Sequence, residues 1–164
     1  MKISIIGTGY VGLVSGVCFA EFGFDVTCVD KDESKIKSLK RGEVTIYEPG
    51  LETILKRSTE SKRLSFTSDL DKAVKNSDIV FIAVGTPSRR GDGHADLSFV
   101  YGVSEEISHS IDGYTLIVTK STVPVGTGKK VKEIIKNNNP NAEFDIASNP
   151  EFLREGSAIE DFMR

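Results

Sequence analysis

A glycine motif near the start of the chain constrains its fold more than any other feature. Residues 7–12 read Gly-Thr-Gly-Tyr-Val-Gly, the pattern G-x-G-x-x-G. The motif follows an apolar run of strand length and opens a segment with helical periodicity, and Asp30 follows the next apolar run about 20 residues on. In this setting Gly7 permits a tight turn, Gly9 lets the backbone approach a pyrophosphate, and Gly12 lets the helix pack closely on the strand. The pattern predicts a dinucleotide site that includes Tyr10 and Val11.

The acidic residue after the second strand indicates which dinucleotide binds. Asp30 is expected to accept hydrogen bonds from the adenosine ribose hydroxyls, and its charge would repel a 2′-phosphate. We therefore expect NAD rather than NADP, although Lys31 and Lys35 weaken this argument because either ammonium could reach a phosphate. Two alternatives are a glycine-rich turn that binds nothing and a methyltransferase, which also has a glycine-rich first loop. The full three-glycine spacing argues against the methyltransferase.

The rest of the chain alternates between strand-length apolar runs and helical segments. Strands are expected at residues 2–6, 25–29, 64–67, 79–84, 116–119 and 144–147, and helices at residues 10–22, 33–40, 51–56, 70–75, 97–111 and 128–136. This order predicts an α/β fold of the Rossmann type: a doubly wound, mostly parallel sheet with helices on both faces. We expect one domain over residues 1–164.

Composition and charge exclude several classes of protein. The net charge is −3, with 21 basic and 24 acidic residues, so the basic excess of a nucleic-acid-binding protein is missing. No apolar run approaches the roughly 20 residues of a membrane helix, and the run that ends at Gly7 is too short for a signal peptide. Cys18 and Cys28 have no metal-type spacing and are interpreted as buried core thiols, and His94 and His109 do not add a metal site. We expect a cytoplasmic protein without a metal.

Two further local patterns are set aside. Residues 126–130 do not form a phosphate-binding P-loop, because the required glycine is replaced by Val123 and the residue after Lys129 is neither Ser nor Thr. The triplet Arg90-Gly91-Asp92 spells an adhesion motif, which is interpreted as a chance occurrence.

Polar loops follow three of the expected strands. They cover residues 83–88, 120–127 and 148–156, and loops at the carboxyl ends of parallel strands are where ligands bind. In the third loop, Asn149 is expected to cap a helix and Pro150 to occupy its first turn, which places Glu151 and Glu155 four apart on one helical face. From spacing alone, a structural interpretation is simpler than a functional one: Glu151 would stabilise the helix dipole, and Glu155 would be exposed to solvent.

Taken together, these segments resemble one family. GTGYVG, YEPGL, AVGTPS, KSTVPVGTG and SNPEFLREGSAIED occur in this order in the UDP-glucose/GDP-mannose dehydrogenases, and the resemblance covers the whole chain. The segments STVPVGTG and REGSAIED are most similar to the UDP-glucose branch. The resemblance implies oxidation of a sugar-nucleotide primary alcohol to a carboxylate with two NAD⁺, so the expected substrate is a UDP-sugar and the expected reaction is UDP-glucose to UDP-glucuronate. GDP-mannose and UDP-N-acetylmannosamine are the alternative substrates.

The resemblance also implies roles for individual residues. It implies cofactor contacts for Gly7, Gly9, Tyr10, Val11, Gly12, Asp30, Lys35, Thr86, Thr122 and Glu155. It implies substrate contacts for Glu151, Phe152, Leu153, Arg154 and Glu155. Thr122, Glu151 and Glu155 are the implied catalytic residues: Glu155 handles the water that hydrolyses a covalent thioester, and Glu151 lies near the proton-transfer machinery.

One departure from the family pattern matters for activity. The family forms its thioester on a cysteine in a later G-G-x-C-x-P-K-D segment, which this sequence lacks, and Cys18 and Cys28 match no such position. We expect the chain to be the N-terminal NAD-binding domain, without the family's central helix and C-terminal substrate domain, and to be inactive alone. The parent is expected to be a homodimer or a higher homo-oligomer. A non-catalytic NAD-binding module is the alternative, although Thr122, Glu151 and Glu155 favour an enzyme.

Overall fold

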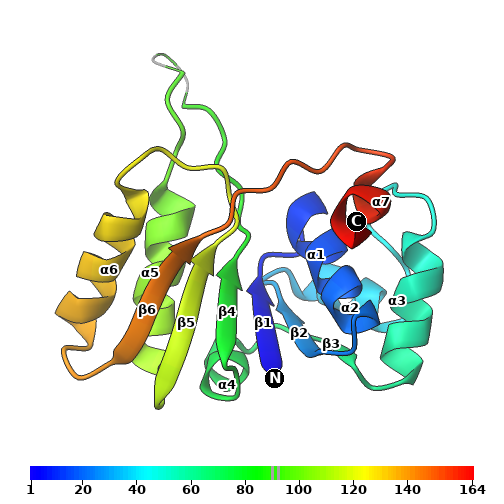
Figure 1. The fold of residues 1–164 in the computed structure, drawn as a ribbon, viewed down its shortest axis with the longest axis horizontal. Coiled ribbons are helices and arrows are strands. Elements are labelled where there is room, and N and C mark those ends of the chain that lie inside the picture. Colours follow the sequence, from blue (N-terminus) through cyan, green and yellow to red (C-terminus); the bar gives the residue numbers. More distant parts are fainter. Residues whose placement is uncertain (90, 92) are drawn as a thin grey trace.

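The structure is a computed structural model, and it describes residues 1–164 except Arg90 and Asp92. The expectation for the triplet Arg90-Gly91-Asp92 therefore lies outside the described residues. Over the described part of the chain, six parallel strands form one sheet in the order β3-β2-β1-β4-β5-β6 (Figure 1). The strands are β1 (Lys2–Ile6), β2 (Asp25–Val29), β3 (Leu64–Thr67), β4 (Ile79–Ile82), β5 (Tyr114–Thr119) and β6 (Glu143–Ser148).

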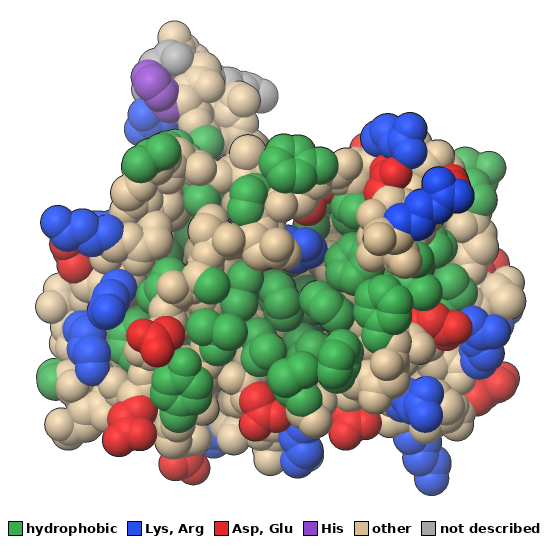
Figure 2. Space-filling view, viewed as in Figure 1, with side chains coloured by type: hydrophobic (Ala, Val, Ile, Leu, Met, Phe, Trp, Pro, Cys, Tyr) green, Lys and Arg blue, Asp and Glu red, His purple; other side chains and the backbone are tan. Residues whose placement is uncertain are grey.

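Helices cover both faces of this sheet, as the sequence predicted. They are α1 (Tyr10–Glu21), α2 (Glu33–Lys40), α3 (Leu51–Glu60), α4 (Leu70–Lys75), α5 (Ser98–Ser110), α6 (Thr127–Asn138) and α7 (Ala158–Met163). Helix α1 contacts α3 and α7 on one face, whereas α5 contacts α4 and α6 on the other (Figure 1). Figure 2 shows apolar side chains gathered over the strands in the middle of the first of these faces. None of the described helices combines the length and apolar character needed to cross a bilayer.

The order of the strands creates a crevice at the carboxyl ends of the central strands. β1 pairs with β2 on one side and with β4 on the other, so Ile6 lies opposite both Val29 and Ile82. The chain therefore leaves the ends of these three neighbouring strands in different directions. Such a switch point is where open parallel sheets bind ligands.

The core consists of two apolar layers, one on each side of the sheet. Cys18 from α1 and Cys28 from β2 are fully buried in the layer beneath α1, and both are free thiols. Burial raises the pKa of each thiol to about 12. The interpretation of both cysteines as core residues is therefore confirmed, and neither has the accessible thiolate that a nucleophile needs.

One predicted element is wrong. Residues 149–157, which we call the strap, are not helical, and α7 begins only at Ala158. The side chain of Asn149 accepts a hydrogen bond from Lys120 Nζ at 3.0 Å instead of capping a helix. The Glu151 carboxylate accepts one from the Leu153 amide at 2.6 Å. Glu151 and Glu155 therefore do not share a helical face; they lie on a segment that crosses from β6 to α7 (Figure 1).

Candidate functional site

The three glycines of the motif have different surroundings. Gly7 has a φ of 103°, and a Cβ atom there would lie 2.7 Å from the Ala83 carbonyl oxygen. A Cβ on Gly12 would lie 1.9 Å from the Gly7 carbonyl oxygen, whereas one on Gly9 would meet nothing within 4 Å. Packing thus requires glycine at positions 7 and 12, and position 9 leaves space for a ligand.

The first turn of α1 is open to an anion. Gly9 precedes the helix, no side chain caps it, and its first turn has no acidic residue. The first amides of a helix have no partners within the helix, and the dipole adds a partial positive charge there. This end of α1 therefore suits a pyrophosphate.

Asp30 follows β2 and is fixed by its neighbours. Its Oδ2 atom accepts hydrogen bonds from the amide and the hydroxyl of Thr8, at 3.0 Å and 2.6 Å, and lies 3.3 Å from Lys35 Nζ. Its Oδ1 atom accepts one from the Asp32 amide at 3.1 Å, which leaves capacity for a further donor. Partial burial would raise the pKa of Asp30, but the hydrogen bonds from Thr8 and Asp32 outweigh it, so the pKa is lowered and the group is ionised at neutral pH.

Thr8 was treated as a variable position of the motif, yet it is fully buried and holds Asp30. The sequence could have indicated this role, because a hydroxyl lies between the first two glycines and a carboxylate is expected at the end of the neighbouring strand. Such a hydroxyl is a natural donor to that carboxylate.

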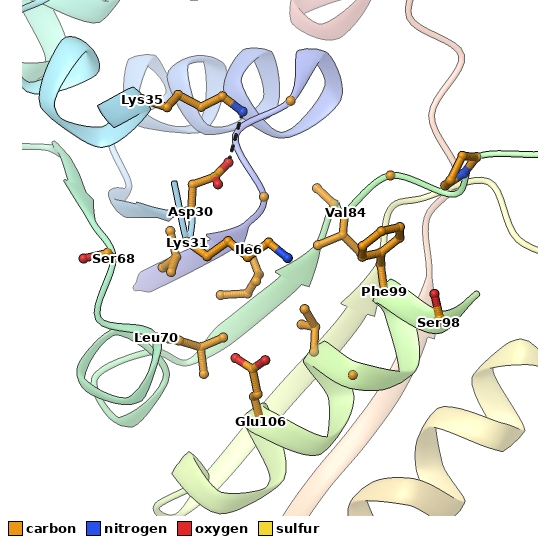
Figure 3. A pocket seen from close by; sticks show the side chains of 18 residues that line it. Ile6, Asp30, Lys31, Lys35, Ser68, Leu70, Val84, Ser98, Phe99 and Glu106 are labelled. Atoms are coloured by element: carbon orange, nitrogen blue, oxygen red, sulfur yellow. Dashed lines mark hydrogen bonds and ion pairs between the residues drawn. The ribbon is translucent and has the colours of Figure 1, made fainter. Parts of the chain in front are cut away.

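A cleft of about 670 Å³ lies between the glycine loop and α5 (Figure 3). Of the predicted residues, it brings together Gly7, Gly9, Asp30 and Lys35. Lys31 reaches across it, with Nζ 5.6 Å from the centre of the Phe99 ring (Figure 3). The residues that line this cleft and that the sequence did not single out include Ser68, Leu70, Phe99, Val103 and Glu106. The last three lie at helical spacing on α5, a pattern that could have identified this wall.

The other predicted residues lie outside this cleft, in three further places: the first turn of α1, the loops after β4 and β5, and the strap. Tyr10, Val11 and Gly12 form the first turn of α1. The loops after β4 and β5 meet where Thr86 Oγ1 donates a hydrogen bond to the Thr122 carbonyl oxygen at 3.3 Å. The loops at these two strand ends are thus adjacent, as their positions in a parallel sheet predicted.

The strap carries the remaining predicted residues. Glu151 and Leu153 are half-buried, whereas Phe152, Arg154 and Glu155 are exposed. The Arg154 guanidinium pairs with Asp161 of α7 at 2.6 Å, so it is already engaged within the domain.

Glu48 is the most consequential residue that the sequence left undecided. Residues 47–51 are one of the segments that carry the family resemblance, but no role was expected for Glu48. Glu48 is buried there and accepts hydrogen bonds from the Tyr10 hydroxyl at 2.5 Å and the Gly156 amide at 2.8 Å. Burial and the adjacent Glu48 raise the pKa of Tyr10 to about 12. This carboxylate connects the start of α1 with the end of the strap.

Fold and site together define a dinucleotide-binding domain of the Rossmann type. Residues 1–164 match the model of the UDP-glucose/GDP-mannose dehydrogenase family, NAD binding domain. The chain belongs to this family, and it is an NAD-binding domain.

Among similar proteins, the UDP-glucose 6-dehydrogenase of Rhizobium meliloti is 64% identical over 164 residues, which cover 100% of this chain and 38% of that protein. UDP-glucose 6-dehydrogenase TuaD of Bacillus subtilis is 55% identical, over 99% of this chain and 35% of that protein. The chain thus spans little more than a third of the length of these relatives.

Solved structures of sugar-nucleotide dehydrogenases are also similar to this chain. A ternary complex of GDP-mannose dehydrogenase from Pseudomonas aeruginosa matches with a TM-score of 0.95 and 40% identity, over 99% of this chain and 38% of that one. A UDP-glucose dehydrogenase from Pyrobaculum islandicum matches with a TM-score of 0.94 and 44% identity, over 98% and 38%.

Proposed function

We propose that this chain is the cofactor-binding part of a longer NAD-dependent dehydrogenase that oxidises UDP-glucose to UDP-glucuronate. The observation that carries the cofactor half of this proposal is Asp30, fixed by Thr8 beside the glycine loop and ionised. The 64% identity with a UDP-glucose 6-dehydrogenase supports the substrate half.

The residues present fit NAD. The space in front of Gly9 and the open amides of α1 suit the pyrophosphate, and the free acceptor capacity of Asp30 suits the ribose hydroxyls. When bound, NAD⁺ accepts the hydride that leaves the sugar carbon. The chain's own contribution is to hold the cofactor against the ends of β1, β2 and β4, with Tyr10, Val11, Gly12 and Lys35 as further contacts.

The loops around Thr86 and Thr122 and the strap would serve the reacting half of the site. Oxidation of an alcohol to a carboxylate removes two hydrides and adds the oxygen of one water molecule, so a group must take protons. We assign proton uptake to Glu155, which is exposed and close enough to Tyr10 at the start of α1 to interact with it electrostatically. Thr122 would line the region of the reacting carbon, and Glu151 would lie near the proton-transfer machinery. Phe152, Leu153 and Arg154 would lie along the UDP-sugar.

The proposed setting follows from the same features. Two unpaired thiols suit the reducing cytoplasm. The central helix and substrate domain of the family would complete the site, and the longer protein would be a homodimer or a higher homo-oligomer. We expect no nucleic acid or membrane partner.

Two measurements test the proposal. Titration calorimetry on the chain should give tighter binding of NAD⁺ than of NADP⁺; equal or tighter NADP⁺ binding would refute the cofactor assignment. A panel of UDP- and GDP-sugars on the longer protein should give turnover with UDP-glucose, whereas preference for GDP-mannose would move the assignment to another branch. The chain alone should convert none of them, because Cys18 and Cys28 are fully buried and neither can serve as the covalent nucleophile.

The role of Glu155 has its own test. In the longer protein, Glu155→Gln should slow hydrolysis of the covalent thioester more than its formation, because an amide cannot take a proton from water. The adduct should accumulate and be visible by intact-protein mass spectrometry. Unchanged turnover without an adduct would remove Glu155 from the mechanism.

A further inference from the structure

The C-terminal end of the strap is held by a buried carboxylate. Glu48 is only 6% exposed, and it accepts hydrogen bonds from the Gly156 and Ile159 amides at 2.8 Å and 3.3 Å. It also accepts one from the hydroxyl of Tyr10, which itself accepts a hydrogen bond from the Gly156 amide at 3.2 Å. An ionised carboxylate that accepts several such bonds holds its donors more firmly than neutral groups do. Glu155 immediately precedes Gly156, whose amide bonds to Glu48.

The N-terminal end of the strap is held by a buried cation. Lys120 directly follows β5 and is 5% exposed, with Nζ 3.0 Å from the Asn149 side-chain oxygen. The same Nζ lies 5.3 Å from the centre of the Phe162 ring of α7. The Asn149 amide and the Phe162 ring together link the first residue of the strap to the helix that follows it, and the carboxylate of Glu151 also attracts this ammonium.

These two anchors enclose the residues to which the proposed function assigns proton transfer. We propose that Glu48 and Lys120 are positioning residues, which clamp the strap at both ends and so fix where Glu151 and Glu155 lie relative to the start of α1. This inference rests on the proposed function for the roles of the two glutamates. A segment without helical or sheet hydrogen bonds has many conformations, and small displacements of a catalytic group are costly, so such a segment needs anchors of this kind.

Amide hydrogen exchange on the chain tests the clamp itself. Glu48→Gln keeps the shape of the side chain and removes its charge, and we expect the Gly156 and Ile159 amides to exchange at least about tenfold faster. Lys120→Met should accelerate exchange of the Asn149 amide, which bonds to the Thr119 carbonyl. Amides of β1 should not change in either variant. Unchanged exchange across the strap in both variants would overturn the proposal.

Matched controls separate the clamp from a general loss of charge. Glu52→Gln is the same substitution on an exposed residue of α3 that pairs with Lys56 at 2.5 Å. Lys136→Met removes an ammonium that lies 5.3 Å from the Phe144 ring and bonds to the Ala142 carbonyl, away from the strap. Neither control should alter exchange in the strap; if both do so as strongly as the clamp variants, the proposal fails. If Glu48→Gln does not fold, Tyr10→Phe removes one bond to the same carboxylate, and it should give a smaller increase at Gly156.

Kinetics of the longer dehydrogenase distinguish positioning from a merely structural role. Glu48→Gln should lower kcat by about tenfold or more, while KM for NAD⁺ and for the sugar nucleotide changes by less than about twofold. A loss of stability alone would leave kcat unchanged below the melting temperature, so faster strap exchange with unchanged kcat would refute the positioning role. If the unsubstituted longer protein oxidises no sugar nucleotide, the proposed function fails, and the exchange experiment still decides whether the clamp exists.

Discussion

The glycine loop and the strap contact each other at Tyr10, yet they are held in place by different means. The loop is fixed by its backbone, because added Cβ atoms at Gly7 and Gly12 would collide with main-chain carbonyl groups. The strap makes few main-chain hydrogen bonds and is fixed by side chains from distant parts of the sequence, chiefly Glu48 and Lys120. The loop is therefore held by close main-chain packing, and the strap by a few side-chain contacts.

The largest expected effect lies on the loop side of this comparison. Gly12→Ala should cost at least about 3 kcal/mol of unfolding free energy, because its Cβ would lie 1.9 Å from a main-chain oxygen that cannot move aside. Gly102→Ala is the matched control in α5, where a Cβ meets nothing within 4 Å, and it should be neutral or stabilising by about 0.5–1 kcal/mol. Urea unfolding measures both. Equal stabilities for the two variants would show that the loop is not fixed by this contact.

Gly9 should separate binding from folding. Gly9→Val should leave the melting temperature nearly unchanged, because position 9 is open and its φ of −69° suits any residue. The side chain would occupy the space of the pyrophosphate, so NAD⁺ affinity should fall by about 100-fold or more. Calorimetry on the folded variant checks this. Unchanged NAD⁺ affinity would mean that the cofactor does not approach the loop here.

A smaller effect is expected at the ribose end of the cleft. Asp30→Ala should weaken NAD⁺ binding by about 1–3 kcal/mol, the cost of lost charge-assisted hydrogen bonds. Because the pKa of Asp30 is lowered, affinity for NAD⁺ should stay constant from pH 8 to pH 5. Asp25→Ala, at the opposite end of β2, is the control and should bind as the unsubstituted chain does. An equal loss in both variants would point to a general charge effect.

The same contrast explains which parts of the molecule could be predicted from the sequence. The fold followed from local periodicity, and Gly7, Gly12 and Asp30 followed from a recurrent motif, although the contact that requires glycine at position 7 is with Ala83, outside the first βαβ unit. The conformation of the strap could not be predicted in this way. Asn149 and Pro150 carry a valid helix-start signal, which the contact of Asn149 with Lys120 overrides.

Other missed residues have a similar cause. Nothing near Glu48 in the sequence indicates that its partners are Tyr10, 38 positions away, and Gly156, 108 positions away. Phe99 and Glu106 were missed because α5 was treated only as a layer of the fold, although its spacing places both on the cleft side.

Acid should act on the strap through Glu48, and this is the smallest effect we expect. Burial would raise the pKa of Glu48, but the hydrogen bonds from Tyr10, Ile159 and Gly156 outweigh it, so the folded-state pKa is below the ordinary value of 4.5. A lowered pKa stabilises the folded chain above about pH 4.5, and this contribution is lost as the pH falls through the folded-state pKa. The difference in unfolding free energy between the unsubstituted chain and Glu48→Gln should therefore be constant from pH 7 to pH 5 and shrink towards pH 3. Urea unfolding at several pH values measures this difference, and the exposed Glu52→Gln control should show almost none at any pH. A difference for Glu48→Gln that does not change with pH would mean that the charge of this carboxylate does not hold the strap.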